Sequence, residues 1–83
     1  MNFHVYILQS KTTGKYYCGQ TDDLAARLVR HNAGVNNYTS HGIPWEIVIS
    51  FQVNTRSEAM ILEKEIKKRG IGRFLNDHQT QKY

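Results

Sequence analysis

The sequence contains one cysteine and one proline, and it has no long run of hydrophobic residues. The lone thiol, Cys18, excludes an internal disulfide and leaves too few thiolates for a structural zinc site. The four histidines show no metal-ligand spacing. No apolar stretch approaches the roughly 20 residues of a membrane helix, and the N-terminus lacks the pattern of a secretory signal. We therefore expect a cytoplasmic protein with no membrane partner.

A chain of 83 residues has room for one domain with one modest core. Hydrophobic residues make up 40% and charged residues 22%, which is typical of a globular protein rather than a disordered one. Neither repeats nor a linker divide the chain. The prediction is a single domain over residues 1–83, with a core at about 3–70 and a frayed tail at about 77–83.

Acidic residues are in the minority. Eleven Lys and Arg stand against seven Asp and Glu, which gives a formal net charge of +4. Such a charge attracts anionic partners, but it is also common in small soluble domains, so charge alone does not decide between these interpretations. The basic residues form one group at Arg27 and Arg30 and a second group late in the chain, at Lys64, Lys67, Lys68, Arg69 and Arg73.

Three segments are expected to form strands. Phe3–Gln9 is apolar at nearly every position, which is typical of a central strand that is covered on both faces. Residues 11–15 form a turn, and Tyr16–Gly19 is a second strand, so the first twenty residues read as a hairpin. After a loop at 34–44, Trp45–Val53 forms the third strand.

Two helices and one short helical turn are expected between and after these strands. Thr21 caps the first helix, which carries Asp22 and Asp23 in its first turn and runs to about Asn32. Its buried stripe should consist of Leu24, Ala25, Leu28 and Val29.

The second helix opens at a capping box, Thr55-x-x-Glu58, and should end near Gly70. A short helical turn follows from Ile71 to Asn76. The order ββαβα predicts an α/β (α+β) fold, in which helices flank a three-stranded antiparallel sheet.

One carboxylate in the second helix is out of place. Ala59, Leu62 and Ile66 form the apolar stripe, and the helical wheel puts Glu63 on the same inward side. A buried carboxylate is costly unless a cation, a donor or a metal pairs with it. The helix pattern alone favours a simpler interpretation, in which the stem packs at the margin of the stripe and the head reaches water.

Several polar and aromatic residues have ordinary explanations when each is taken alone. Tyr6, Tyr16 and Tyr17 are typical core residues of strands. Arg27 and His31 lie one turn apart on one helix face, which is usually solvated.

Together, however, these residues resemble the GIY-YIG nuclease superfamily. The first motif falls on His4-Val5-Tyr6 and the second on Tyr17-Cys18-Gly19. The resemblance covers about residues 3–70 and is greatest to small stand-alone bacterial members. The stretches RLxxHN and PWE also resemble the nuclease subunit that cuts branched DNA, which implies a role in DNA repair. The other matching residues are Gln20 to Leu24, Arg27-Leu28, Arg30-His31-Asn32, Pro44-Trp45-Glu46, Ala59-x-x-Leu62-Glu63 and Ile66-Lys67-Lys68.

The chain departs from the family pattern at several positions. His4 and Val5 replace Gly and Ile of the first motif, and Cys18 replaces Ile of the second. Gln20 stands where the excision-repair members carry a lysine, so that cation is missing. Asn76 is a candidate counterpart, at a looser spacing, of an Asn that supports the site in some members.

The resemblance implies a metal-dependent endonuclease that hydrolyses phosphodiester bonds in nucleic acid, with DNA as the expected substrate. One Mg²⁺ or Mn²⁺ ion would bind at Glu63, because the chain shows no second acidic cluster for a two-metal site. Tyr6 would act as general base, and Tyr17 would orient water or phosphate. Arg27 would hold the scissile phosphate, and His31 would relay a proton or bind phosphate. Gly19 would let the backbone approach closely. The residues implied in nucleic-acid binding are Arg27, Arg30, Lys67 and Lys68.

These roles require Tyr6, Tyr17, Arg27 and Glu63 to converge in one concave, solvent-reachable site, with His31 at its edge. The main alternative is an inactive module of the same fold that holds nucleic acid or a partner protein, and a purely structural domain is the third. A domain this small has little surface for sequence readout, so specificity has to come from a protein partner or from the shape of the substrate.

Overall fold

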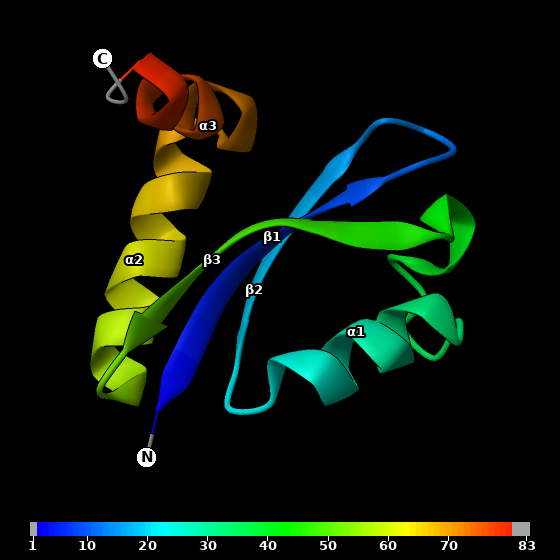
Figure 1. The fold of residues 1–83 in the computed structure, drawn as a ribbon, viewed down its shortest axis with the longest axis horizontal. Coiled ribbons are helices and arrows are strands. Elements are labelled where there is room, and N and C mark those ends of the chain that lie inside the picture. The colour runs from blue at the N-terminus through cyan, green and yellow to red at the C-terminus, as the bar shows by residue number, and fades with distance from the viewer. Residues whose placement is uncertain (1, 81–83) are drawn as a thin grey trace.

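The computed structural model describes residues 2–80. It contains a three-stranded antiparallel sheet in the order β2-β1-β3, with helices on both faces (Figure 1). The predicted fold class and the central place of β1 are thus confirmed. The elements in chain order are β1 (Phe3–Ser10), β2 (Tyr16–Thr21), α1 (Leu24–Asn32), the 3-10 turn η1 (Ser40–Gly42), β3 (Trp45–Val53), α2 (Arg56–Arg69) and α3 (Ile71–Thr80).

Strand β1 is buried on both faces, since Val5, Tyr6, Ile7 and Leu8 are almost wholly inaccessible to solvent. Alternate side chains of a strand point to opposite faces, so β1 contributes to two separate cores. One core lies under α2 and α3, and α1 covers the other (Figure 1). The buried residues under α2 and α3 are Val5, Ile7, Cys18, Ala59 and Ile66; those on the side of α1 are Tyr6, Leu8 and Trp45.

Helix α1 begins later than predicted. Its N-cap is Asp23, whose side chain accepts a hydrogen bond from the backbone of Ala26 at 3.1 Å. Asp22 and Asp23 therefore precede the first turn instead of lying in it. Thr21, the predicted cap, accepts a hydrogen bond from the backbone of Asp23 and so shapes the turn before the helix.

The predicted buried stripe of α1 is only half right. Leu24 and Leu28 pack against the core, but Ala25 is exposed and Val29 is 67% exposed. The inward position one turn after the leucines belongs to His31, which is buried. The helix therefore points a polar ring, rather than Val29, at the sheet.

Helix α2 follows the prediction. Thr55 caps it by accepting a hydrogen bond from the backbone of Glu58 at 3.1 Å, and Ala59 and Ile66 are fully buried. The helix ends at Arg69, and Gly70, with φ of 94°, turns the chain into α3.

Helix α3 is longer than the predicted turn at Ile71–Asn76, and it continues to Thr80 through part of the segment expected to fray. Two contacts stabilise this extension. The Phe74 and His78 rings pack together and against Phe51, and Arg69 pairs with Asp77 at 2.9 Å. Residues 81–83 of the predicted tail lie outside the described residues. Over the described part of the chain, no helix is long and apolar enough to cross a membrane.

Candidate active site

A buried chain of polar side chains connects β1 to α1 and to the loop before β3. The Tyr6 hydroxyl lies 3.0 Å from His31 Nε2, and His31 Nδ1 lies 2.9 Å from Thr39 Oγ1. The ordinary interpretation of this helix face as solvated does not hold for His31, because only 1% of its surface is exposed. The ring is buried without an unsatisfied nitrogen because Tyr6 and Thr39 supply both partners.

The surroundings favour the neutral forms of both rings. Burial, together with the positive charges of Arg27 and Arg30, lowers the pKa of His31. Burial and the neighbouring Tyr17 raise the pKa of Tyr6 well above its ordinary value; Arg27 opposes this shift, and Glu63 adds to it. A neutral histidine carries one N–H, so it donates to one of its two partners and accepts from the other.

Tyr17 and Gly19 enclose the outer side of this pair. The Tyr17 ring meets the His31 ring edge to face at 4.9 Å and lies 6.3 Å from the Tyr6 ring. Gly19 pairs with Tyr6 across the two strands, and a Cβ at Gly19 would lie 2.6 Å from the Tyr6 hydroxyl. The second motif therefore needs glycine at this position for space.

Two arginines of α1 stand next to the buried histidine. Arg27, which is half-buried, and Arg30 line a cavity together with His31, Val35 and Asn36. Because the charge of Arg27 acts on both Tyr6 and His31, an anion bound in this cavity would lie close to the polar chain.

Glu63 reaches the site from the opposite helix layer. Its side chain is 18% exposed; Oε1 accepts a hydrogen bond from Gln20 at 3.1 Å, and Oε2 accepts one from Lys67 at 2.6 Å. The inward carboxylate thus has both a donor and a cation, as its burial requires.

Tyr6 and Glu63 start on opposite faces of the sheet and come together at its β2 edge. Tyr6 packs on Gly19, and Glu63 bonds to Gln20, the next residue of the same strand. Tyr17 and Lys67 line a common cavity at this edge. The residues proposed for chemistry thus surround β2 without sharing the one concave site that was expected. Arg27 and His31 line one cavity, Glu63 lines another and Tyr17 a third, and Tyr6 is buried.

The carboxylate of Glu63 is the type of ligand that a hard divalent ion prefers. Among the described residues, no group of three or more His, Cys, Asp or Glu side chains is placed so that it could hold a metal ion. Mg²⁺ binds through one or two carboxylates and keeps several waters. Gln20 turns its Nε2 toward Glu63, and its Oε1 is buried without a hydrogen-bond partner, so a rotation of the amide would offer a second oxygen of the required type. An ion at Glu63 has to displace the ammonium group of Lys67.

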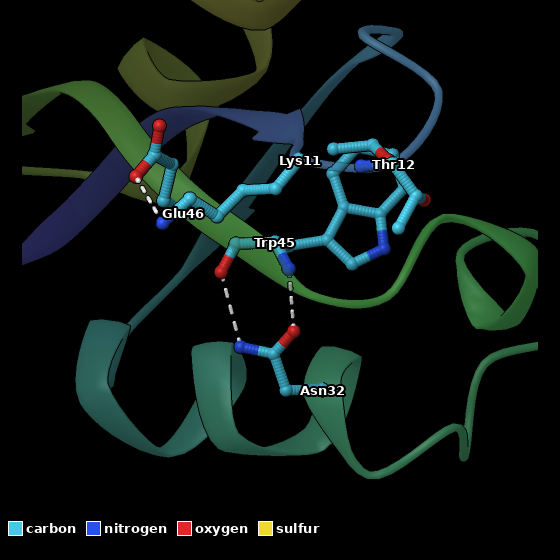
Figure 2. A network of polar contacts seen from close by, with 6 residues as sticks. Lys11, Thr12, Asn32, Trp45 and Glu46 are labelled. Carbon is cyan, nitrogen blue, oxygen red and sulfur yellow. Dashed lines mark hydrogen bonds and ion pairs between the residues drawn. The ribbon is translucent and has the colours of Figure 1, made fainter.

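Four residues that position the site were not assigned roles from the sequence. Thr39 orients His31 and Gln20 holds Glu63, and neither contact has a local sequence signal. Asn32 joins the end of α1 to the start of β3: its side chain donates to the Trp45 carbonyl at 3.1 Å and accepts from the Trp45 N–H at 2.6 Å (Figure 2). Asn32 and Trp45 stood in matched motifs, but sequence spacing did not reveal their pairing.

Two remaining candidates lie apart from this polar chain. Lys68 is exposed on α2, and Asn76 is exposed on α3. Lys67, in contrast, is bound directly to Glu63, and this contact raises the pKa of Lys67.

The fold and the sequence together place the chain in a known class of proteins. Residues 2–70 match the GIY-YIG catalytic domain, and the chain belongs to this nuclease family. Among proteins of that kind, it is similar to a set named UPF0213, a name that states no activity. It is 37% identical to UPF0213 protein BH0048 of Halalkalibacterium halodurans over 68 residues, which are 81% of this chain and 71% of that protein.

Two further comparisons agree. UPF0213 protein YsiG of Lactococcus lactis is 31% identical, and the match covers 98% of this chain and 83% of YsiG. The solution NMR structure of UPF0213 protein BH0048 from Bacillus halodurans superposes with a TM-score of 0.56 at 32% identity, covering 98% of this chain and 84% of that one. The fold is therefore shared with an experimentally determined relative.

Proposed function

We propose that the protein is a metal-dependent endonuclease that hydrolyses phosphodiester bonds in nucleic acid, with DNA as its substrate. The observation that carries this proposal is the hydrogen bond between Tyr6 and the neutral His31, set between an arginine-lined cavity and the Glu63 carboxylate. The membership in the GIY-YIG family supports the reaction class.

Tyr6 would act as the general base with the help of His31. Its raised pKa makes free tyrosinate scarce at neutral pH, so the hydroxyl has to lose its proton as it takes one from water. His31 Nε2 accepts that proton while Nδ1–H donates to Thr39, and the lowered pKa of His31 keeps Nε2 available as an acceptor. Since Tyr6 is buried, substrate binding has to open a path for water to its hydroxyl.

Arg27 and Tyr17 would position the phosphate. A guanidinium matches the planar fork of two phosphate oxygens and stabilises charge that develops on them. Tyr17, half-buried beside His31, would orient the attacking water through its hydroxyl.

Glu63 and Gln20 would hold one Mg²⁺ or Mn²⁺ ion. Once bound, the ion would supply charge stabilisation at the leaving 3′ oxygen. Lys67, released from Glu63, would then be free to contact a neighbouring phosphate together with Arg30 and Lys68.

Replacing Glu63 by Gln tests the proposal, because it keeps the shape and the hydrogen bond to Gln20 but removes the charge. We expect loss of cleavage in Mg²⁺ or Mn²⁺, with fold and nucleic-acid binding retained. The matched control is Glu65→Gln, on an exposed position of the same helix, which should leave cleavage unchanged. The assay uses labelled duplex, single-stranded, flap and branched substrates, with chelator lanes.

Equal cleavage by wild type and Glu63→Gln would overturn the one-metal mechanism. Absence of cleavage by wild type on every substrate would instead favour the alternative, a module of this fold that binds nucleic acid or a protein partner without cutting.

A further inference from the structure

A further cavity lies next to the site, where the rings of Tyr38 and Trp45 neighbour that of Tyr17. It forms between the β1–β2 turn and the loop before β3, and its walls are largely aromatic. Tyr16, Tyr38 and Trp45 contribute rings, while the exposed Lys15 contributes a cation and the exposed His41 a polar ring. None of the roles proposed for cleavage uses this cavity.

Tyr38 is the most unusual wall of the cavity. It is 73% exposed, yet its ring lies 5.8 Å from that of Tyr17, so it stands between this cavity and the site. It also lines the neighbouring cavity that contains Tyr17 and Lys67. An exposed ring at the junction of two cavities offers a flat apolar surface to a ligand.

Trp45 gives the cavity a rigid base. Its N–H donates to the Thr39 carbonyl at 2.7 Å, so its one polar side-chain atom is already satisfied. Gly42 packs so tightly against the indole that a Cβ there would lie 2.5 Å from Trp45 Cζ2. Thr39 also bonds to His31, which connects the base of the cavity directly to the residues proposed for proton transfer.

Aromatic surface next to cations is the chemistry that recognises an unpaired nucleotide, whose base stacks on a ring while its phosphate meets a positive charge. A base inside a duplex has both faces covered by its neighbours and cannot use such a surface. We propose that this cavity binds an unpaired base of the substrate strand, close to the scissile phosphate. The inference rests on the proposed nuclease function and extends it to substrates with unpaired nucleotides.

The sole tryptophan of the chain makes the proposal directly measurable. Trp45 fluorescence is titrated with a short oligothymidylate and, separately, with a blunt duplex, in chelator so that no cleavage occurs. We expect the single strand to change the fluorescence in a salt-dependent manner. Tyr38→Ala should weaken single-strand binding about tenfold, as expected for one lost stacking contact, and should leave duplex binding unchanged.

Three further variants separate stacking from a general effect on the fold. Tyr38→Phe keeps the ring and should bind like wild type. Lys15→Ala should weaken single-strand binding and lower its salt dependence by about one phosphate contact. Val29→Ala, at another exposed apolar position away from the cavity, should change nothing. Thermal unfolding of each variant shows whether the fold is intact.

Single-strand binding by Tyr38→Ala equal to that of wild type overturns the inference, and so does a wild-type preference for the blunt duplex. These measurements distinguish a failure of the base-binding proposal from a failure of the proposed nuclease function. If the protein cuts duplex DNA without any influence of Tyr38, the nuclease function stands and the base-binding cavity does not. If no substrate is cut while single-strand binding depends on Tyr38, the cavity stands and the nuclease function does not.

Discussion

At the scale of the residue, the Tyr6 hydroxyl occupies the space where other amino acids carry a β-carbon at position 19. Gly19 is therefore required by the geometry of Tyr6, which in turn is fixed by its bond to His31. A single methyl group at this point pushes against the hydroxyl on which the proposed chemistry depends.

Gly19→Ala should lower the stability by about 1–3 kcal/mol, as overpacking of a filled core does, and should impair cleavage more than nucleic-acid binding. Urea unfolding and the cleavage assay measure the two effects. Gly72→Ala is the matched control, because its nearest neighbour would be 4.0 Å from the new Cβ and alanine favours a helix. Wild-type stability and activity in Gly19→Ala would show that Tyr6 can move without consequence.

His31 should make the stability depend on pH. Its pKa in the folded protein is lowered by burial and by Arg27 and Arg30, so the unfolded chain takes up the proton first as the pH falls. The stabilising contribution is complete above the unfolded value of about 6.5 and decreases as the pH falls through and below it.

Urea unfolding at several values between about pH 5 and 8 measures this dependence. His31→Gln should be less stable at neutral pH and should flatten the acid side of the profile. His41→Gln, at an exposed position, should retain the profile of the wild type. If stability depended on pH to the same extent in all three proteins, the pH dependence would be due to groups other than His31.

At the scale of the element, the sequence predicted structure correctly where the interacting residues are close together along the chain. The capping box at Thr55, the turn at Gly14 and the doubly buried β1 were predicted because their evidence lies within a few residues. The start of α1 was predicted two residues too early, at Thr21 instead of Asp23, because both residue types can cap a helix and only the backbone geometry distinguishes them.

The cap of α1 gives a matched pair of adjacent aspartates. Asp23→Ala removes the side chain that accepts from Ala26 and should cost about 1 kcal/mol. Asp22→Ala, exposed and outside the cap, should change the stability by less than about 0.5 kcal/mol. Thermal or urea unfolding compares them, and equal losses in both variants would contradict the assignment of Asp23 as the cap.

At the scale of the whole molecule, the contacts among the proposed site residues could not be predicted from the sequence. The residue types came from the family motifs. Their contacts depend on three elements meeting at β2, and no local pattern reveals that Gln20 holds Glu63 or that Thr39 orients His31. His31 was misplaced for the same reason: a polar ring becomes a core residue only when distant partners satisfy both nitrogens.

The rate at which a thiol reagent modifies Cys18 reports on the packing of α2 against the sheet. Burial and the charge of Glu63 raise its pKa to about 11, and it is 2% exposed, so the reactive thiolate is scarce and shielded at neutral pH. Alkylation then proceeds only during transient openings of the native protein. An opening that lifts α2 from β2 also separates Glu63 from Gln20. The rate of Cys18 labelling therefore reports how often the carboxylate of Glu63, proposed to bind the metal, separates from Gln20.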